Sequence, residues 1–122
     1  MRALIVDDSR AIRRIIGDIM KELGYAISEA GNGLEALERL REIGTPDIVL
    51  IDWNMPVMNG LDLIRAIRAN PEYSDLPLMM VTTETEMERM AMAFMAGVNE
   101  YVMKPFDKAA ILDKLQLLGI GA

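Results

Sequence analysis

Short apolar runs alternate along the chain with longer segments of helical periodicity. The apolar runs cover residues 3–6, 25–28, 48–51, 78–81 and 101–103. Between them, apolar residues recur three and four positions apart, the spacing that turns one face of a helix toward a core. Strands and helices in alternation are typical of βαβ units. We therefore predict an α/β fold with a five-stranded parallel sheet and five helices.

The first predicted helix shows the clearest apolar stripe. Its members are Ile12, Ile15, Ile16, Ile19, Met20 and Leu23. Ser9 is the expected N-cap and Gly24 the expected stop. We predict the other helices over residues 33–43, 60–69, 84–96 and 108–118. Because no linker or repeat divides the chain, we expect residues 1–122 to form one domain without an output domain.

Composition narrows the possible functions. The chain has no cysteine and no histidine, which excludes disulfides, thiolate zinc sites and the commonest general base. Any metal must then be a hard cation bound by oxygen. A net charge of −6 argues against a nucleic-acid partner. No run approaches the roughly 18 apolar residues of a membrane span. We expect a cytoplasmic monomer that binds neither nucleic acid nor membrane.

Polar residues follow four of the five predicted strands. They are Asp7 and Asp8 after the first, Asp52 after the third, Thr82 and Thr83 after the fourth, and Lys104 after the fifth. The carboxyl ends of parallel strands lie on one edge of a sheet. If the second strand is the outer one, the flavodoxin-like order 2-1-3-4-5 brings these residues together at the switch point between strands one and three.

The chemistry of such a cluster follows from its charges. Three neighbouring carboxylates repel one another, and a divalent cation is their natural neutraliser. A partly open carboxylate site suits Mg²⁺, whose coordination a phosphate oxygen commonly completes. Lys104 offers a positive charge to that phosphate, and Thr82 offers a hydroxyl donor. Asp52 is then equipped to accept a phosphoryl group.

Several motifs together resemble one known family, the receiver domains of bacterial response regulators. The matching stretches are Leu4-Ile5-Val6-Asp7-Asp8-Ser9, Asp52 with Met55-Pro56 and Met58-Asn59-Gly60, Val81-Thr82-Thr83, and Lys104-Pro105-Phe106. The resemblance extends over essentially the whole chain. Trp53 and Asn54 after Asp52, together with Glu84, are most similar to the chemotaxis, CheY-type, subgroup.

The resemblance implies a role for each site residue. Asp52 would be the phosphoacceptor. Mg²⁺ would be bound by Asp8, Asp52 and the backbone carbonyl of Asn54, with Asp7 acting mostly through water. Thr82 and Lys104 would contact the phosphoryl oxygens, and Tyr101 would be a switch residue that turns inward with Thr82. The bond between Lys104 and Pro105 would be cis.

The resemblance also implies partners. A sensor histidine kinase, of the chemotaxis type, would donate the phosphoryl group, and a downstream signalling or motor protein would bind the face made by helix 84–96, strand 101–103 and helix 108–118. The chain would catalyse only its own phosphorylation and dephosphorylation, so we do not expect an enzyme. Alternatives are a phosphorelay shuttle, a free-standing receiver outside chemotaxis and, more distantly, a Mg²⁺-dependent aspartate phosphatase.

Two further patterns permit two interpretations each. Helix 84–96 carries four methionines, Met87, Met90, Met92 and Met95. Either Met87 and Met90 pack on the sheet together with Phe94, or some of the methionines form an adaptable docking surface. Three arginines on the first helix, Arg10, Arg13 and Arg14, form either a solvated face or an electrostatic contact for the phosphodonor protein.

Overall fold

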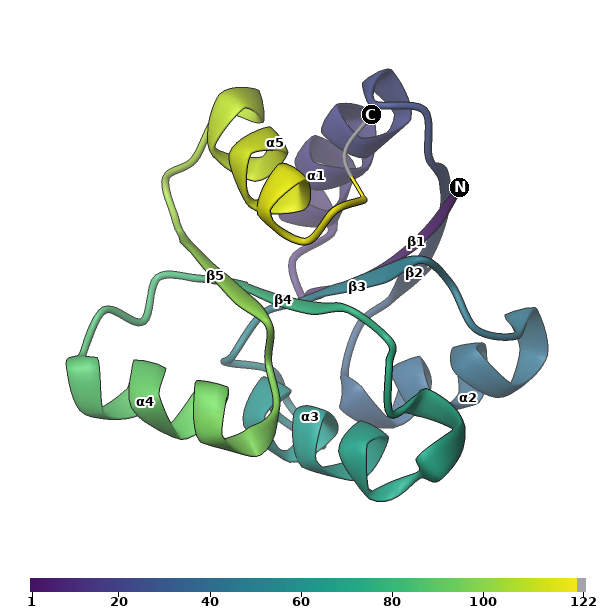
Figure 1. Cartoon of the computed structure of the whole chain (residues 1–122), viewed down its shortest axis with the longest axis vertical. Coiled ribbons are helices and arrows are strands. Elements are labelled where there is room, and N and C mark those ends of the chain that lie inside the picture. Colours follow the sequence, from purple (N-terminus) through teal and green to yellow (C-terminus); the bar gives the residue numbers. More distant parts are fainter. Residues whose placement is uncertain (121–122) are drawn as a thin grey trace.

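Five parallel strands form the middle layer of the structure, a computed structural model that describes residues 1–120. The strands are β1 (Arg2–Val6), β2 (Ala26–Ala30), β3 (Ile48–Ile51), β4 (Leu78–Thr82) and β5 (Glu100–Met103). The helices are α1 (Arg10–Glu22), α2 (Gly33–Ile43), α3 (Gly60–Ala69), α4 (Met87–Ala96) and α5 (Lys108–Leu117), with a short 3-10 helix, η1 (Pro71–Tyr73). Helices α1 and α5 cover one face of the sheet, and α2, α3 and α4 cover the other (Figure 1).

The order of the strands confirms the predicted α/β topology. Within residues 1–120 the sheet runs β2-β1-β3-β4-β5, and every neighbouring pair is parallel. In the register, Val6 of β1 lies beside Ile51 of β3. Asp7 and Asp52, the next residues along each strand, therefore leave the same edge of the sheet from adjacent strands. Thr82 pairs with Met103 in the same way, so Lys104 follows at that edge.

The core lies on both faces of the sheet because β3 is buried completely. Its alternate residues point to opposite sides: Val49 and Ile51 pack toward the α2–α4 layer, whereas Ile48 and Leu50 pack toward α1 and α5. Each fully buried aliphatic side chain contributes about 1.5–3 kcal/mol of hydrophobic stabilisation. These contacts fix β3 in the centre and so fix the position of Asp52.

Several predicted boundaries shift by one to three residues. The side chain of Ser9 caps α1 as expected, and Gly24 follows the helix at φ +96°. Helix α4 begins at Met87, not at Glu84, because residues 83–86 form a loop. Strand β2 spans residues 26–30, so it begins one residue later and ends two residues later than the apolar run at 25–28.

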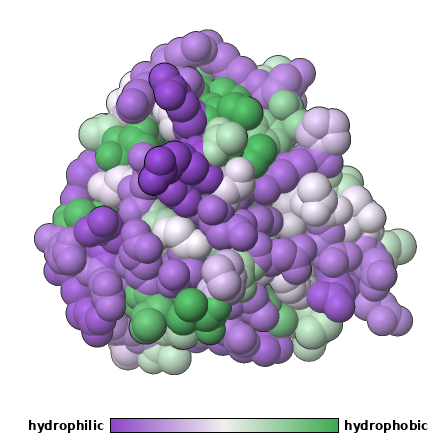
Figure 2. Space-filling view, turned by 180° about the vertical axis from the view of Figure 1, so that it is seen from behind, coloured by the Kyte–Doolittle hydropathy of each residue, from purple (hydrophilic) through white to green (hydrophobic). Residues whose placement is uncertain are grey.

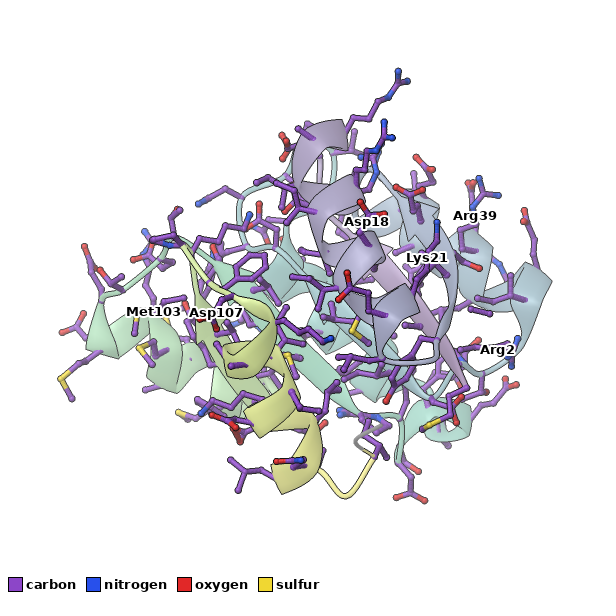
Figure 3. The ribbon with its side chains drawn as sticks, turned by 90° about the horizontal axis from the view of Figure 1, so that it is seen from above. Arg2, Asp18, Lys21, Arg39, Met103 and Asp107 are labelled. Carbon is purple, nitrogen blue, oxygen red and sulfur yellow. The ribbon has the colours of Figure 1, made fainter. Side chains whose placement is uncertain are left out.

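The outer surface is mainly polar. Seen from behind, hydrophilic residues cover most of the face, and hydrophobic residues form separate patches among them (Figure 2). Asp18 and Lys21 lie on α1, on the side of the molecule seen from above (Figure 3). Among residues 1–120, no helix combines the length and apolar character needed to cross a membrane.

Candidate functional site

Three aspartates gather at the carboxyl edge of β1 and β3. One carboxylate oxygen from each of Asp7, Asp8 and Asp52 lies within 4.8 Å of the others. Asp7 and Asp52 are buried, with Asp52 only 8% exposed, whereas Asp8 faces solvent. The sequence predicted this cluster from strand ends 45 positions apart, and the structure brings its members together.

Backbone groups orient the two buried carboxylates. The Asp52 N–H donates to the Val6 carbonyl at 2.9 Å, which extends the ladder between β1 and β3 by one residue. Asp52 Oδ1 then accepts a hydrogen bond from the Trp53 N–H at 2.8 Å. Asp7 Oδ1 accepts in the same way from the Ser9 N–H at 2.8 Å. In each carboxylate, Oδ2 is left to face the interior of the cluster.

Lys104 places its ammonium between these two oxygens. Its Nζ lies 2.8 Å from Asp7 Oδ2 and 3.6 Å from Asp52 Oδ2. The peptide bond from Lys104 to Pro105 is cis, as predicted, and the Lys104 N–H donates to the Thr82 carbonyl at 2.9 Å. One ammonium among three carboxylates leaves excess negative charge, so the cluster has both the ligands and the charge for a metal ion.

The surroundings of Asp52 disfavour its ionised form. Burial, and after it the negative charge of Asp7, raises the pKa of Asp52 above its usual value. The Lys104 ammonium, a hydrogen bond from the Thr82 hydroxyl and the Trp53 N–H act in the opposite direction without cancelling the rise. The ionised carboxylate is thus under-compensated, and a cation bound beside it would stabilise its charge.

Tyr101 belongs to β5, and its buried side chain lies beside α4. Its hydroxyl donates to the Glu84 carbonyl at 2.7 Å, and its ring lies 6.3 Å from the Phe94 ring, centroid to centroid. Burial, and then the charges of Glu84 and Asp52, raise the pKa of Tyr101 to about 12. Because the side chain is only 6% exposed, the ring is already turned inward.

The methionines of α4 divide between the two interpretations. Met90 is half-buried and packs against the core, as the packing interpretation predicts. For Met87 that interpretation is wrong, because the side chain is 85% exposed. Phe94 is partly exposed and contacts Tyr101, while Met92 and Met95 face solvent. Met103, the last residue of β5, is also exposed (Figure 3).

The loop between β3 and α3 is held rigidly beside Asp52. The Gly60 N–H donates to the Trp53 carbonyl at 2.8 Å, and a Cβ on Gly60 would lie 2.1 Å from the Asp52 carbonyl oxygen. Val57, at φ 69°, is the central residue of a tight turn in which the Met58 N–H donates to the Pro56 carbonyl at 2.7 Å. Asn54 lies exposed in this loop, and the ligand role of its carbonyl stays a prediction.

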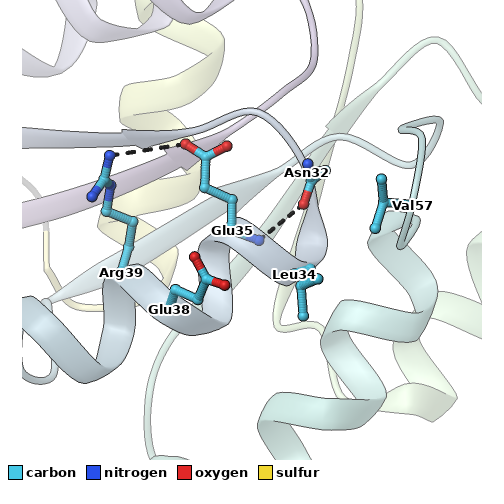
Figure 4. A pocket seen from close by; sticks show the side chains of 6 residues that line it. All are labelled: Asn32, Leu34, Glu35, Glu38, Arg39 and Val57. Atoms are coloured by element: carbon cyan, nitrogen blue, oxygen red, sulfur yellow. Dashed lines mark hydrogen bonds and ion pairs between the residues drawn. The ribbon is translucent and has the colours of Figure 1, made fainter.

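A surface hollow of about 420 Å³ lies next to this loop, between Val57 and the start of α2 (Figure 4). It is lined by Asn32, Leu34, Glu35, Glu38, Arg39 and Val57. The Asn32 side chain accepts from the Glu35 N–H at 2.9 Å and so caps α2. None of the three clustered aspartates lines this hollow, so it is separate from the carboxylate site.

Two arginines beside the site were not assigned such contacts from the sequence. Arg13 of α1 donates to the Asp7 carbonyl, and its Nε lies 3.1 Å from Glu29 Oε1. Arg13 therefore connects α1 to the residue that follows β1 and to β2. Arg89 places its guanidinium carbon 5.6 Å from the centre of the Trp53 ring. No spacing in the sequence marks either contact, because each depends on how neighbouring helices pack.

Comparison with known proteins decides the family. The profile of the response regulator receiver domain matches residues 3–116. The chain belongs to the response regulator receiver domain family. Its curated relatives include the chemotaxis protein CheY1 of Helicobacter pylori, 41% identical over 119 residues, which cover 97% of this chain and 96% of the relative. Chemotaxis protein CheY-3 of Vibrio cholerae is 45% identical, over 94% of this chain and 88% of the relative.

Solved receiver structures have the same fold. The chemotaxis protein CheY4 of Vibrio cholerae superposes with a TM-score of 0.89 at 33% identity, covering 96% of this chain and 97% of that one. A response regulator from Chloroflexus aurantiacus has a TM-score of 0.88 at 28% identity, covering 97% of both chains. The predicted membership in the CheY-type subgroup of receivers is thereby confirmed. The roles of individual residues stay predictions.

Proposed function

We propose that this receiver is a phosphorylation-activated signalling protein of a two-component system that acts in chemotaxis. The observation that carries the proposal is the position of Asp52, inside a three-carboxylate cluster and 3.6 Å from the Lys104 ammonium. The names of the curated relatives support the assignment to chemotaxis. The phosphodonor would be a chemotaxis-type sensor histidine kinase. The proposal includes a cytoplasmic location, where such kinases meet ATP, and a single receiver domain as the acting unit.

In this proposal the cluster holds Mg²⁺. Hard oxygen ligands and uncompensated negative charge are what this cation requires, and the three aspartates offer both. Asp8, Asp52 and the Asn54 carbonyl would be ligands, and Asp7 would act mostly through water. When bound, the ion supplies positive charge that offsets the charge of the phosphoryl oxygens.

Asp52 itself is the nucleophile in this proposal. As the N–P bond of the donor's phosphohistidine breaks, an O–P bond forms to an Asp52 carboxylate oxygen, and the departing imidazole nitrogen takes up a proton. The Lys104 ammonium would move from Asp7 toward the phosphoryl oxygens, and Thr82 would donate its hydroxyl to them. Later hydrolysis of the acyl phosphate by water resets the carboxylate. The chain thus changes its own state and turns over no independent substrate.

The new charge would bias a two-state equilibrium. Thr82 ends β4, the strand between β3 and β5, and its hydroxyl bonds to Asp52. The Tyr101 hydroxyl is bonded to the Glu84 carbonyl in the loop before α4. A phosphoryl group that draws on the Thr82 hydroxyl would favour the inward position of Tyr101. The face formed by α4, β5 and α5 would then bind a downstream signalling or motor protein.

Phosphoryl uptake tests the proposal directly. We expect purified protein with Mg²⁺ and acetyl phosphate to gain the mass of one phosphoryl group, and Trp53 fluorescence to change with Mg²⁺ and again with acetyl phosphate. Asp52→Asn should take up nothing. The matched control is Asp62→Asn, which removes an exposed carboxylate on α3 and should behave like the wild type. Uptake by Asp52→Asn equal to the wild type would refute the assignment.

The choice of target needs a second experiment. A downstream protein should bind more tightly to the chain loaded with beryllofluoride, a mimic of the aspartyl phosphate, than to the unloaded chain. Restored swimming reversals in a strain that lacks its own chemotaxis regulator would support the chemotaxis role. If the protein takes up phosphoryl groups but does not restore swimming reversals, a phosphorelay shuttle or a free-standing receiver becomes the better assignment.

A further inference from the structure

Helix α4 has no side-chain N-cap. Ser9, Asn32, Asn59 and Asp107 each cap a helix with a side-chain hydrogen bond, but Glu86, the N-cap residue of α4, makes none. A side-chain cap stabilises a helix by about 1 kcal/mol. The position of this helix start therefore depends on tertiary contacts more than that of the other α-helices described in residues 1–120.

Arg89 provides such a contact on the side of Trp53. Its guanidinium carbon lies 5.6 Å from the centre of the Trp53 ring, within the range of a cation–π interaction. Trp53 is itself buried, and its backbone N–H donates to Asp52 Oδ1. A residue on the first turn of α4 is thus connected through one side chain to the proposed phosphoacceptor.

Arg89 also holds the loop that precedes α4. Its Nε lies 3.7 Å from Glu84 Oε2 and 4.0 Å from Glu86 Oε2. The backbone of Glu84 is held from the other side, because its carbonyl accepts from the Tyr101 hydroxyl at 2.7 Å and its N–H donates to Thr82 Oγ1 at 3.4 Å. Segment 84–89 is therefore held by its own Arg89 on one side and by the two proposed switch residues, Thr82 and Tyr101, on the other.

We propose that Arg89 is a positioning residue for the phosphorylation site: it clamps segment 84–89 in the conformation in which Tyr101 is buried and Thr82 lies beside Asp52. The inference rests on the proposed function, since it concerns how strongly the site binds a phosphoryl group. When a ligand binds only one conformation, its apparent affinity falls in proportion as the population of that conformation falls. Removing the clamp lowers this population and so weakens the binding of phosphoryl groups, without touching the carboxylates that would bind the cation.

The test measures two ligands on one chain. Trp53 fluorescence gives the dissociation constant of Mg²⁺ alone, and then that of beryllofluoride in saturating Mg²⁺. For Arg89→Gln we expect an unchanged Mg²⁺ constant and roughly three-fold weaker beryllofluoride binding, the size of one exposed cation–π contact with its ion pairs. Arg89→Lys keeps the charge but not the planar group, so it should fall between Arg89→Gln and wild type.

Arg65→Gln is the matched control. It removes the same charge from α3, where Arg65 pairs with Asp62 at 3.6 Å on the surface, and it should bind both ligands like the wild type. Unfolding by urea checks that Arg89→Gln is folded. Equal weakening of Mg²⁺ and beryllofluoride, or an unchanged beryllofluoride constant, would overturn the clamp. If the wild type itself binds no beryllofluoride, the proposed function fails and the clamp fails with it.

A double-mutant cycle separates the clamp from a general effect of charge. In a Glu84→Gln background, Arg89 has lost its nearer ion-pair partner, so Arg89→Gln should weaken beryllofluoride binding less than it does in the wild type. Full additivity of the two substitutions would show that Arg89 acts without Glu84 and would contradict the arrangement proposed for segment 84–89.

Discussion

At the carboxyl edge of β1 and β3, charged groups are buried and partnered, whereas α4, one layer away, turns apolar side chains outward. Among the described residues, no buried side-chain nitrogen or oxygen lacks a hydrogen-bond partner. On α4, by contrast, Met95 is 88% exposed, and only Ala93 is fully buried. Each region reverses the usual distribution of polarity, and each reversal has a cost that ordinary packing would avoid.

The difference separates a region where position is fixed from one where it is adjustable. The buried charges around Asp52 are stable only if every partner is held in place, and backbone N–H groups and Gly60 lie against them. The exposed methionines of α4 have flexible side chains that fit surfaces of various shapes. Substitutions should therefore affect the two regions very differently, in folding as well as in function.

The largest effect is expected at Gly60. A Cβ there would lie 2.1 Å from the Asp52 carbonyl oxygen, and neither backbone segment can move without disturbing β3. We expect Gly60→Ala to lower the free energy of unfolding by about 3 kcal/mol or more and to reduce phosphoryl uptake. Urea unfolding followed by circular dichroism measures the first effect, and mass spectrometry measures the second.

Gly17→Ala is the matched control for that substitution. Gly17 lies within α1, where a Cβ would meet the Ile5 side chain at an ordinary 3.7 Å. Alanine is the better helix former by roughly 0.5–1 kcal/mol, so Gly17→Ala should be neutral or stabilising. Equal destabilisation by both substitutions would show that the rigidity around Asp52 is not local to the site.

An intermediate effect is expected from the charge of Asp52. Because burial and Asp7 raise its pKa in the folded state, folding disfavours the ionised form. The contribution of Asp52 to stability is thus most favourable below its ordinary pKa of 3.8 and is lost as the pH rises through the higher folded-state value. Without divalent cations, Asp52→Asn should be more stable than wild type at neutral pH by about 1 kcal/mol.

Two conditions check the cause of that gain. It should disappear at a pH below 3.8, where Asp52 is protonated in both states. It should also shrink when Mg²⁺ is added, because a cation that binds only the folded wild type stabilises it. A gain that persists at acid pH would mean that the asparagine improves packing and that charge is not the reason.

The smallest effect on folding is expected on α4. Met95→Gln changes a solvent-exposed side chain, so the free energy of unfolding should stay within about 0.5 kcal/mol of the wild-type value. Phosphoryl uptake should equal that of the wild type within error. Met80→Gln, in the centre of β4, is the buried counterpart and should cost about 2 kcal/mol or more. If Met95→Gln weakens binding of the downstream protein, the exposed sulfur belongs to the docking face.

The chain's own residue pattern was sufficient for the alternation of strands and helices and for a carboxylate cluster, once the flavodoxin-like strand order was assumed. Four apolar residues between Asp47 and Asp52 indicate a strand buried on both faces, and a parallel topology then brings all strand ends to one edge. Asp7, Asp52, Thr82 and Lys104 could be assigned to one site because each directly follows a strand. The register of the sheet then places these residues at one edge.

The positions around α4 could not be predicted in this way. Helical periodicity did not distinguish Met87 from Met90, because both are apolar and the boundary of the helix lies three residues later than the pattern suggested. The contact of Arg89 with Trp53 depends on the angle at which α4 meets the sheet, which no local spacing encodes. The inward position of Tyr101 likewise depends on a carbonyl in a loop, that of Glu84.

The sequence by itself determined where the charges of this protein gather, because burial and period-two alternation act locally along each strand and a parallel sheet has only one carboxyl edge. The tertiary structure decided how those charges are held and which apolar residues stay outside. Lys104 contacts Asp7 more closely than Asp52, and Arg89 reaches the neighbour of Asp52, only because separate elements pack at particular angles. Such contacts join residues with no sequence relation, so only the packed chain defines them.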